Sequence, residues 1–204
     1  MKLHLGCGDR YWDVCVNVER YAERVDKRID LSKMVRAEFG YSSCSEIAAH
    51  HVVEHLNPLD AARLFANCYA WLAPGGTLAI EMPDRLKCID LIRKGTVHTD
   101  QHGCTRPLGA LGIVGGRPHH KPEFMRWLRD NQAMIRQAAE SLHYVPVHNI
   151  PDQFHDPGSA HLYVWTEAEL IEDLTDLGFT CRATKPKTHG KRTNRDMRVE
   201  ATKT

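Results

Sequence analysis

Short apolar runs alternate with amphipathic stretches along the first half of the chain. The apolar runs have the length and composition of buried strands, and turn residues or helical spacing follow them. This alternation predicts an α/β domain with a largely parallel sheet. The expected strands cover residues 2–5, 14–18, 25–30, 46–50 and 77–82.

One amphipathic helix is expected from Pro58 to Ala73, where apolar residues recur close to every 3.6 positions. Asn57 can cap its first turn, and Pro58 suits the first helical position. Pro74 and the two glycines after it are expected to end the helix and lead into the next strand.

Helical patterns also occur in the second half of the chain, at 85–93, 121–142 and 166–177. Thr166 and Glu169 form a capping-box pattern, and Gly178 suits the end of that last helix. Residues 179–184 and 198–201 then have the pattern of a terminal β-hairpin.

A glycine-rich stretch at 95–120 and an irregular stretch up to 159 surround the expected helix at 121–142. Long loops of this kind are commonly functional. We therefore expect a single domain over 1–204, in which 95–162 forms a lid or a substrate-recognition insertion.

The composition is that of an ordinary globular protein, with 42% hydrophobic and 26% charged residues among 204. No apolar run approaches the roughly 18 residues of a membrane-spanning helix. The seven cysteines are scattered without a CxxC pair, which suits reduced thiols. We expect a soluble cytoplasmic protein that does not bind membranes, and its oligomeric state cannot be read from the sequence.

Positive charge is concentrated near the C-terminus, although the net charge of the chain is only +1. Seven Lys or Arg residues lie between Lys185 and Lys203, against two acids. This segment is either a solvated hairpin loop or a contact surface for an anionic partner such as nucleic acid.

Two glycines directly follow the first expected strand, in the sequence Leu3-His4-Leu5-Gly6-Cys7-Gly8. Glycines at this point let the backbone turn sharply and let a ligand approach main-chain atoms. A dinucleotide-binding loop would have a third glycine where this chain has Tyr11. The pattern therefore disfavours a nicotinamide cofactor.

Acidic residues end the next two expected strands. Glu19 lies at the end of the second strand, where a carboxylate can accept hydrogen bonds from both hydroxyls of a ribose. Asp30 and Leu31 end the third strand and suit the amino group and the ring face of an adenine. Three successive strand ends thus carry residues that are compatible with one nucleoside ligand.

Together these motifs resemble the class I S-adenosylmethionine-dependent methyltransferases, especially small members of the type 11-like group. Residues 49–56 are similar to the fourth-strand signature of the family, and residues 72–78 to the turn before its fifth strand. The resemblance covers 2–84 and 163–202. It implies a Rossmann-like, mostly parallel seven-stranded sheet with a C-terminal antiparallel hairpin.

The resemblance also assigns roles at the S-adenosyl-L-methionine site. The segment Leu3–Gly8, here called the glycine loop, would contact the methionine end of the cofactor. Glu19 would hold the ribose, and Asp30 and Leu31 would meet the adenine. The implied activity is methyl transfer by in-line displacement. The cofactor-binding residues it implies are Gly6, Cys7, Gly8, Glu19, Asp30, Leu31 and His51.

The sequence departs from the family in two respects. Only residues 9–13 separate the first two expected strands, too few for a full crossover helix, so the first crossover must be abbreviated. Residues 84–162 have no counterpart in the family, and such segments usually recognise the substrate. The methyl acceptor therefore stays unidentified, and we expect a small molecule.

Two histidines are candidates for a general base above the methyl donor, namely His55 and His120. The ordinary pKa of a histidine suits proton removal at neutral pH. A hydroxyl acceptor would need such a base, whereas a neutral amine or a thiolate would need positioning alone.

Two other functions stay open. His51-Val52-Val53-Glu54-His55 fits the H-x-x-E-H motif of inverted zinc peptidases, in which His51 and His55 would bind zinc on one helical face and Glu54 would activate water. Alternatively, the chain is a non-catalytic module that binds nucleic acid or a protein through its basic 185–203 segment.

Overall fold

The computed structural model describes residues 1–8, 10–96, 161–187 and 192–204, together with the single residues Ala110, Arg126, Asp130, Ala133 and Gln137. Apart from these single residues, the expected helix at 121–142 and most of the expected lid at 95–162 lie outside the described residues. None of the helices formed by the described residues is long and apolar enough to cross a membrane.

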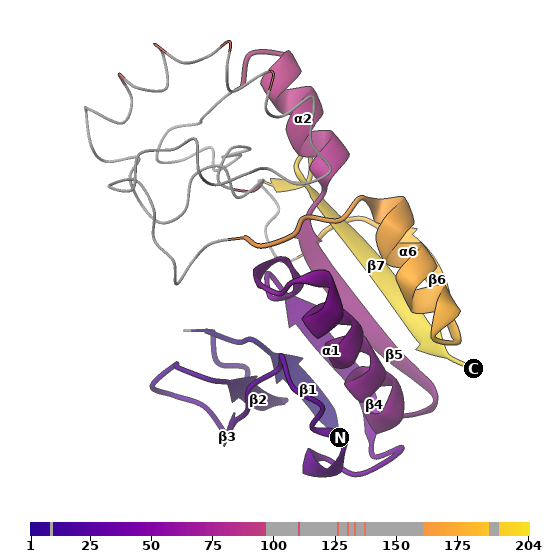
Figure 1. Cartoon of the computed structure of the whole chain (residues 1–204). Coiled ribbons are helices and arrows are strands. Elements are labelled where there is room, and N and C mark those ends of the chain that lie inside the picture. Colours follow the sequence, from indigo (N-terminus) through magenta and orange to yellow (C-terminus); the bar gives the residue numbers. More distant parts are fainter. Residues whose placement is uncertain are drawn as a thin grey trace.

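A seven-stranded sheet forms the centre of the molecule (Figure 1). Its strands are β1 (Lys2–Leu5), β2 (Val16–Glu19), β3 (Lys27–Arg28), β4 (Cys44–His50), β5 (Leu72–Pro83), β6 (Phe179–Thr184) and β7 (Asp196–Lys203). Their spatial order is β3-β2-β1-β4-β5-β7-β6. The first five strands are parallel, and β7 is antiparallel to both of its neighbours. The predicted fold class is confirmed.

The helices begin and end close to the expected positions. The described ones are α1 (Pro58–Trp71), α2 (Arg85–Arg93) and α6 (Glu167–Asp176), with short 3₁₀ turns η1 (Arg36–Glu38) and η2 (Val53–His55). Asn57 caps α1 by accepting from the amide of Asp60, as its sequence position predicted. Thr166 and Glu169 form the predicted capping box at the start of α6.

One apolar core joins the sheet to α1 and α6, which both lie in front of it in Figure 1. Alternate residues of each strand point to this face, since successive side chains in a strand point to opposite sides. Leu64 and Phe65 of α1 and Leu170 and Leu174 of α6 pack in the same cluster as the strand residues. The strand residues Leu3, Leu5, Ile47, Leu78, Ile80 and Val199 are all at most 1% exposed.

Strand β5 begins five residues earlier than the sequence suggested, directly after α1. Leu72 already pairs with Cys44, whereas the next described pair is Thr77 with Glu46. The residues between Leu72 and Thr77 therefore bulge out of the ladder. Gly75 has a φ of +76° in this bulge, a conformation that a glycine adopts without a Cβ penalty.

The connection between β1 and β2 contains no helix among its described residues. It spans residues 6–15, because β1 ends at Leu5 as expected and β2 begins only at Val16, two residues later than expected. In place of a helix, the fully buried side chain of Asn17 holds this loop in position. Its side chain accepts from the amide of Trp12 (2.9 Å) and donates to the carbonyls of Trp12 (2.9 Å) and Cys15 (3.0 Å). The abbreviated first crossover is thus a hydrogen-bonded loop.

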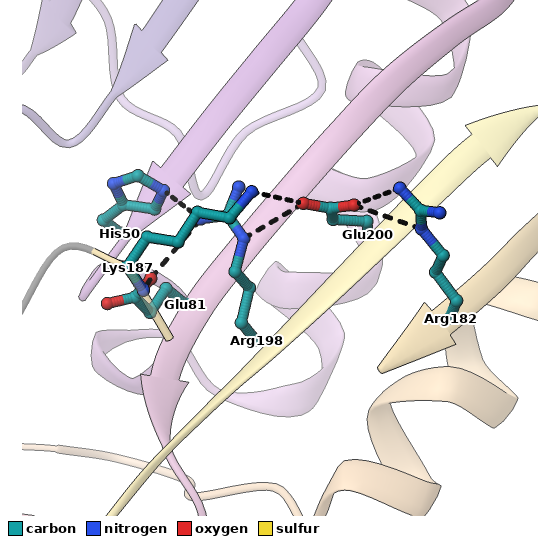
Figure 2. A network of polar contacts seen from close by, with 6 residues as sticks. All are labelled: His50, Glu81, Arg182, Lys187, Arg198 and Glu200. Carbon is teal, nitrogen blue, oxygen red and sulfur yellow. Dashed lines mark hydrogen bonds and ion pairs between the residues drawn. The ribbon is translucent and has the colours of Figure 1, made fainter. Parts of the chain in front are cut away.

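The opposite face of the central strands carries a network of charged side chains (Figure 2). Glu81 of β5 is fully buried and accepts from the amide of Lys187 at 2.8 Å. Arg198 of β7 lies 3.4 Å from Glu81 and 3.2 Å from Glu200. Glu200 also pairs with Arg182 at 2.7 Å. The network therefore neutralises part of the basic C-terminal segment within the protein.

Glu200→Gln is expected to lower the melting temperature at pH 7 by about 2–4 °C. Hydrogen bonds from Arg182, Arg198 and Lys187 lower the pKa of Glu200 to about 2. Because the folded-state pKa lies below the ordinary carboxyl value, this stabilisation is complete above about pH 5 and disappears as the pH falls toward 2.

Melting curves of wild type and Glu200→Gln between pH 7 and pH 2 test this expectation. The difference between the two proteins should shrink as the pH falls. Glu46→Gln is the control, because Glu46 makes an exposed ion pair with Lys2 and should matter less. A constant difference at every pH would contradict the expectation.

Candidate functional site

A cleft of about 560 Å³ lies outside the carboxyl ends of β1, β2, β3 and β4. In parallel α/β sheets this edge is where ligands bind, at the point where the strand order reverses. Here that point lies between β1 and β4, since β2 and β3 lie on one side of β1 and β4 and β5 lie on the other. Six of the seven predicted cofactor residues line the cleft, namely Gly6, Gly8, Glu19, Asp30, Leu31 and His51.

The glycine loop closes one side of the cleft. Gly6 has a φ of +61°, and a Cβ at this position would lie 2.1 Å from Cγ2 of Val52. Its amide donates to the carbonyl of Val18 at 2.8 Å, which turns the chain at the end of β1. Cys7, the seventh predicted residue, is 3% exposed and is not among the cleft-lining residues. Its side chain is therefore packed inside the protein.

Glu19 connects the second strand end to the glycine loop. Its Oε2 atom accepts from the amide of Gly8 at 3.3 Å, and its Oε1 atom accepts from the amide of Arg20 at 2.6 Å. Each carboxylate oxygen has two lone pairs, so both retain acceptor capacity after these bonds. Glu19 can accept from a ligand while it fixes the loop.

The third strand end forms the apolar and acidic wall of the cleft. Ile29 and Leu31 are buried there, at 6% and 8% exposure. The Ser32 hydroxyl donates to Asp30 at 2.6 Å and lowers the pKa of this carboxyl, and Arg20 lies 2.9 Å from its other oxygen. Asp30 is thus held as a carboxylate in a fixed orientation.

His51 lies at the fourth strand end in a left-handed conformation, with a φ of +57°. Such a conformation costs a residue with a side chain roughly 1–2 kcal/mol. Its Nδ1 atom donates to Glu54 at 2.9 Å, and its Nε2 atom lies 3.3 Å from Asp196. Both carboxylates are fully buried. The backbone strain is therefore balanced by a buried ionic cluster behind the cleft.

The positive charge of His51 and the negative charges of Glu54 and Asp196 stabilise one another. Burial by itself would lower the pKa of His51, but the contact with Asp196 and the hydrogen bond to Glu54 outweigh it and raise the pKa above the usual value. Burial would likewise raise the pKa of Glu54, but the hydrogen bond and the positive charge of His51 lower it. His51 is consequently an imidazolium between two carboxylates.

The zinc motif predicted from His51 and His55 is not formed. His51 directly follows β4 in a left-handed conformation, and the only helical residues from His51 to His55 are the single 3₁₀ turn Val53–His55. The two histidines therefore do not share a helical face, and both ring nitrogens of His51 face carboxylates. The prediction of an inverted-peptidase zinc site is wrong.

His55, the first candidate for a general base, lines the cleft next to Leu56. Its ring lies edge-on to the ring of His161, with centroids 4.8 Å apart. Burial lowers the pKa of His161 to about 4, so this imidazole is neutral at physiological pH. His120, the second candidate, lies outside the described residues.

Two residues of the site could not be recognised in the sequence. Asp196 begins β7 and follows a basic stretch, and His161 lies near the end of the segment without a family counterpart. Long-range pairing brings Asp196 next to His51 and His161 next to His55, since β7 lies beside β5 and the amide of Leu162 donates to the carbonyl of Glu54. No local pattern marks either residue.

Of the comparisons with known proteins, only the comparison of structures finds similar proteins. No protein-family model and no curated protein sequence matches the chain. An S-adenosylmethionine-dependent methyltransferase structure from Mesorhizobium loti is similar with a TM-score of 0.52 and 14% identity, over 99% of this chain and 90% of that one. One from Archaeoglobus fulgidus gives 0.52 and 12%, over 99% and 85%.

The chain has the class I methyltransferase fold. At 12–14% identity these similarities establish the fold alone. Open α/β sheets bind ligands outside the carboxyl ends of their strands, so the location of the cleft agrees with the topology. The residues in the cleft decide what it can bind.

Proposed function

We propose that the chain is an S-adenosyl-L-methionine-dependent methyltransferase, and that the cleft at the strand edge is its cofactor site. The observation that carries this proposal is the convergence of four strand ends on one cleft. A glycine turn follows β1, Glu19 ends β2, Asp30 follows β3 and His51 follows β4, and all four line the same space.

The cleft offers complementary groups to each part of the cofactor. Glu19 keeps acceptor capacity for the ribose hydroxyls. Ile29 and Leu31 provide an apolar surface for the adenine ring, with Asp30 beside them as an acceptor for its amino group. The turn at Gly6 and Gly8 leaves main-chain atoms accessible for the methionine end.

S-adenosyl-L-methionine supplies a methyl group on a positively charged sulfur when it is bound. The residues of the chain then have to hold the acceptor atom in line with that methyl group and exclude water. Such alignment can account for about 7–11 kcal/mol of the barrier. If the acceptor is a hydroxyl, His55 lies at the cleft wall in a position to take its proton.

The basic C-terminal segment gives less support to a nucleic-acid-binding module. Lys187 and Arg198 pair with Glu200, and Arg195 pairs with Asp196. Lys203 donates to two backbone carbonyls near α1. Within the described part of 185–203, these cations serve contacts inside the protein, so we favour a small-molecule acceptor.

Glu19→Gln is expected to abolish most of the stabilisation by S-adenosylhomocysteine, the demethylated product of the cofactor. Wild type at a saturating ligand concentration should melt about 5–10 °C higher than without ligand. The carboxamide that replaces the carboxylate has one oxygen acceptor and one NH₂ donor, so the ribose contact would be weakened.

Thermal melting with and without S-adenosylhomocysteine measures this effect. The matched control is Asp13→Asn, which neutralises an exposed acid whose contact is Arg24, away from the cleft. The control should retain the full ligand-induced shift. An equal shift in wild type and Glu19→Gln would contradict the role of Glu19.

A further inference from the structure

Glu54, His55 and His161 form a cluster beside the cofactor cleft. One ligand-type atom of each residue, a carboxylate oxygen or an imidazole nitrogen, lies within 4.8 Å of the other two. Glu54 is fully buried, and His55 also lines the cleft. The cluster thus lies at the boundary between the protein interior and the space proposed for the cofactor.

Backbone hydrogen bonds hold the turn that carries Glu54 and His55 next to the segment that carries His161. The carbonyl of Glu54 accepts from the amides of Leu162 at 2.8 Å and Tyr163 at 3.4 Å. These bonds fix the chain that carries His161 against the 3₁₀ turn that carries Glu54 and His55. Main-chain hydrogen bonds therefore help to keep the three side chains close together.

Hydrogen bonds also orient two of the three side chains. Nδ1 of His161 lies 2.8 Å from the carbonyl oxygen of Ala110, which can only accept. The proton must therefore be on Nδ1, and Nε2 is the ring nitrogen with an available lone pair. Metal-binding histidines almost always donate their other ring N–H to such an oxygen.

The carboxylate of Glu54 is oriented in a similar way. Its Oε1 atom accepts from His51 at 2.9 Å. Its Oε2 atom is buried and accepts no hydrogen bond from any described residue. A buried carboxylate oxygen without a partner is unfavourable, and a cation would satisfy it. Asp196, on the far side of His51, extends this support to the Oε1 side of the carboxylate.

We propose that Glu54, His55 and His161 bind one divalent transition-metal ion of the zinc class. Two imidazole nitrogens and one carboxylate oxygen are the ligand set of catalytic zinc sites, which keep a position open. Ligand atoms around such an ion lie roughly 3.3 Å apart, given bonds of about 2.0–2.1 Å. The ligand atoms would therefore have to move closer to one another by up to about 1.5 Å. Rotation of the partly exposed His55 side chain permits this movement.

The proposal rests on the proposed methyl transfer and narrows the acceptor to an oxygen nucleophile. The open position of the ion would bind an acceptor hydroxyl at the cleft wall and lower its pKa. His55 would then act as a metal ligand in place of a base, and the proton of the hydroxyl would leave to solvent. The bound oxygen would then form a bond to the methyl carbon as the carbon–sulfur bond breaks. The electron pair of that broken bond would stay on sulfur, which becomes a neutral thioether.

Cobalt binding tests the site without any assay of activity. Chelator-treated full-length protein is titrated with Co²⁺, whose visible absorption reports imidazole and carboxylate coordination, and with Zn²⁺ by calorimetry. We expect one site per chain. His161→Ala and His55→Gln should each weaken affinity at least about tenfold. His55→Gln keeps a polar side chain of similar reach, so this variant addresses binding even if His161→Ala misfolds.

The matched control is His50→Gln. His50 is the histidine adjacent to His51, and it lies against Arg198 in the polar network instead of the cluster (Figure 2). It should bind Co²⁺ like wild type. Binding that His55→Gln and His161→Ala leave unchanged, or no binding at all, would overturn the metal site.

The same metal-free samples are titrated with S-adenosylhomocysteine. Binding of this ligand together with failure of Co²⁺ binding would overturn the metal site alone, and the proposed function would stand. Failure of both ligands on folded protein would overturn both proposals.

Discussion

His51→Ala is expected to lower the free energy of unfolding by about 3–5 kcal/mol, the usual cost of removing one partner of a buried ion pair. The substitution leaves Glu54 and Asp196 fully buried, and Glu54 loses its hydrogen bond from Nδ1. Two buried carboxylates close together then repel each other. Chemical denaturation at pH 7 measures the loss.

The neighbouring histidine provides the comparison. Burial lowers the pKa of His50 to about 4, so His50 is neutral, and His50→Ala removes no charge. It should cost clearly less than His51→Ala. In the His51→Ala background, Glu54→Gln should recover part of the stability, because Glu54 has lost its ion partner while Asp196 still pairs with Arg195. Equal losses for the two histidines would contradict the ionic account.

Gly6→Ala is expected to destabilise the protein by about 2–4 kcal/mol and to weaken S-adenosylhomocysteine binding at least about tenfold. The added Cβ would lie 2.1 Å from Val52, and the φ of +61° is unfavourable for alanine. Relief of this clash must move either the loop or Val52, and both line the cleft. Urea denaturation and calorimetric titration measure the two effects.

Gly8→Ala separates backbone strain from the clash. Gly8 has a φ of +51°, but a Cβ there would meet no atom within 4 Å. We therefore expect only about 1 kcal/mol of destabilisation from this substitution. Val52→Ala should partly rescue Gly6→Ala, because it removes the atoms that clash. A Gly8→Ala loss as large as that of Gly6→Ala would show that the contact with Val52 is not decisive.

Much of the fold could be predicted because its signals are local. The capped helices and the first strand follow periodicity, cap residues and turn residues within a few positions of each element. The bounds of β1, α2 and β6 agree with the prediction at both ends. The early start of β5 was missed because Leu72 pairs with a strand whose register the sequence does not specify.

The candidate site was predictable only where it follows directly after a strand. Glu19 and Asp30 each end or follow a strand, so their common edge could be inferred from the parallel topology. Asp196 and His161 arrive through long-range pairing, and nothing near them in the sequence marks a function. His51 was assigned to the right cleft, but its buried carboxylate partners could be seen only in the structure.

Calorimetric titration of the wild-type protein with S-adenosylhomocysteine tests the central claim most directly. We predict one site per chain with a Kd between about 1 µM and 1 mM, the range of enzyme affinities for their substrates. Titration at two temperatures guards against a binding enthalpy near zero, since burial of an apolar ring changes the heat capacity. Absence of heat at both temperatures with millimolar ligand and folded protein would contradict the assignment of the cleft.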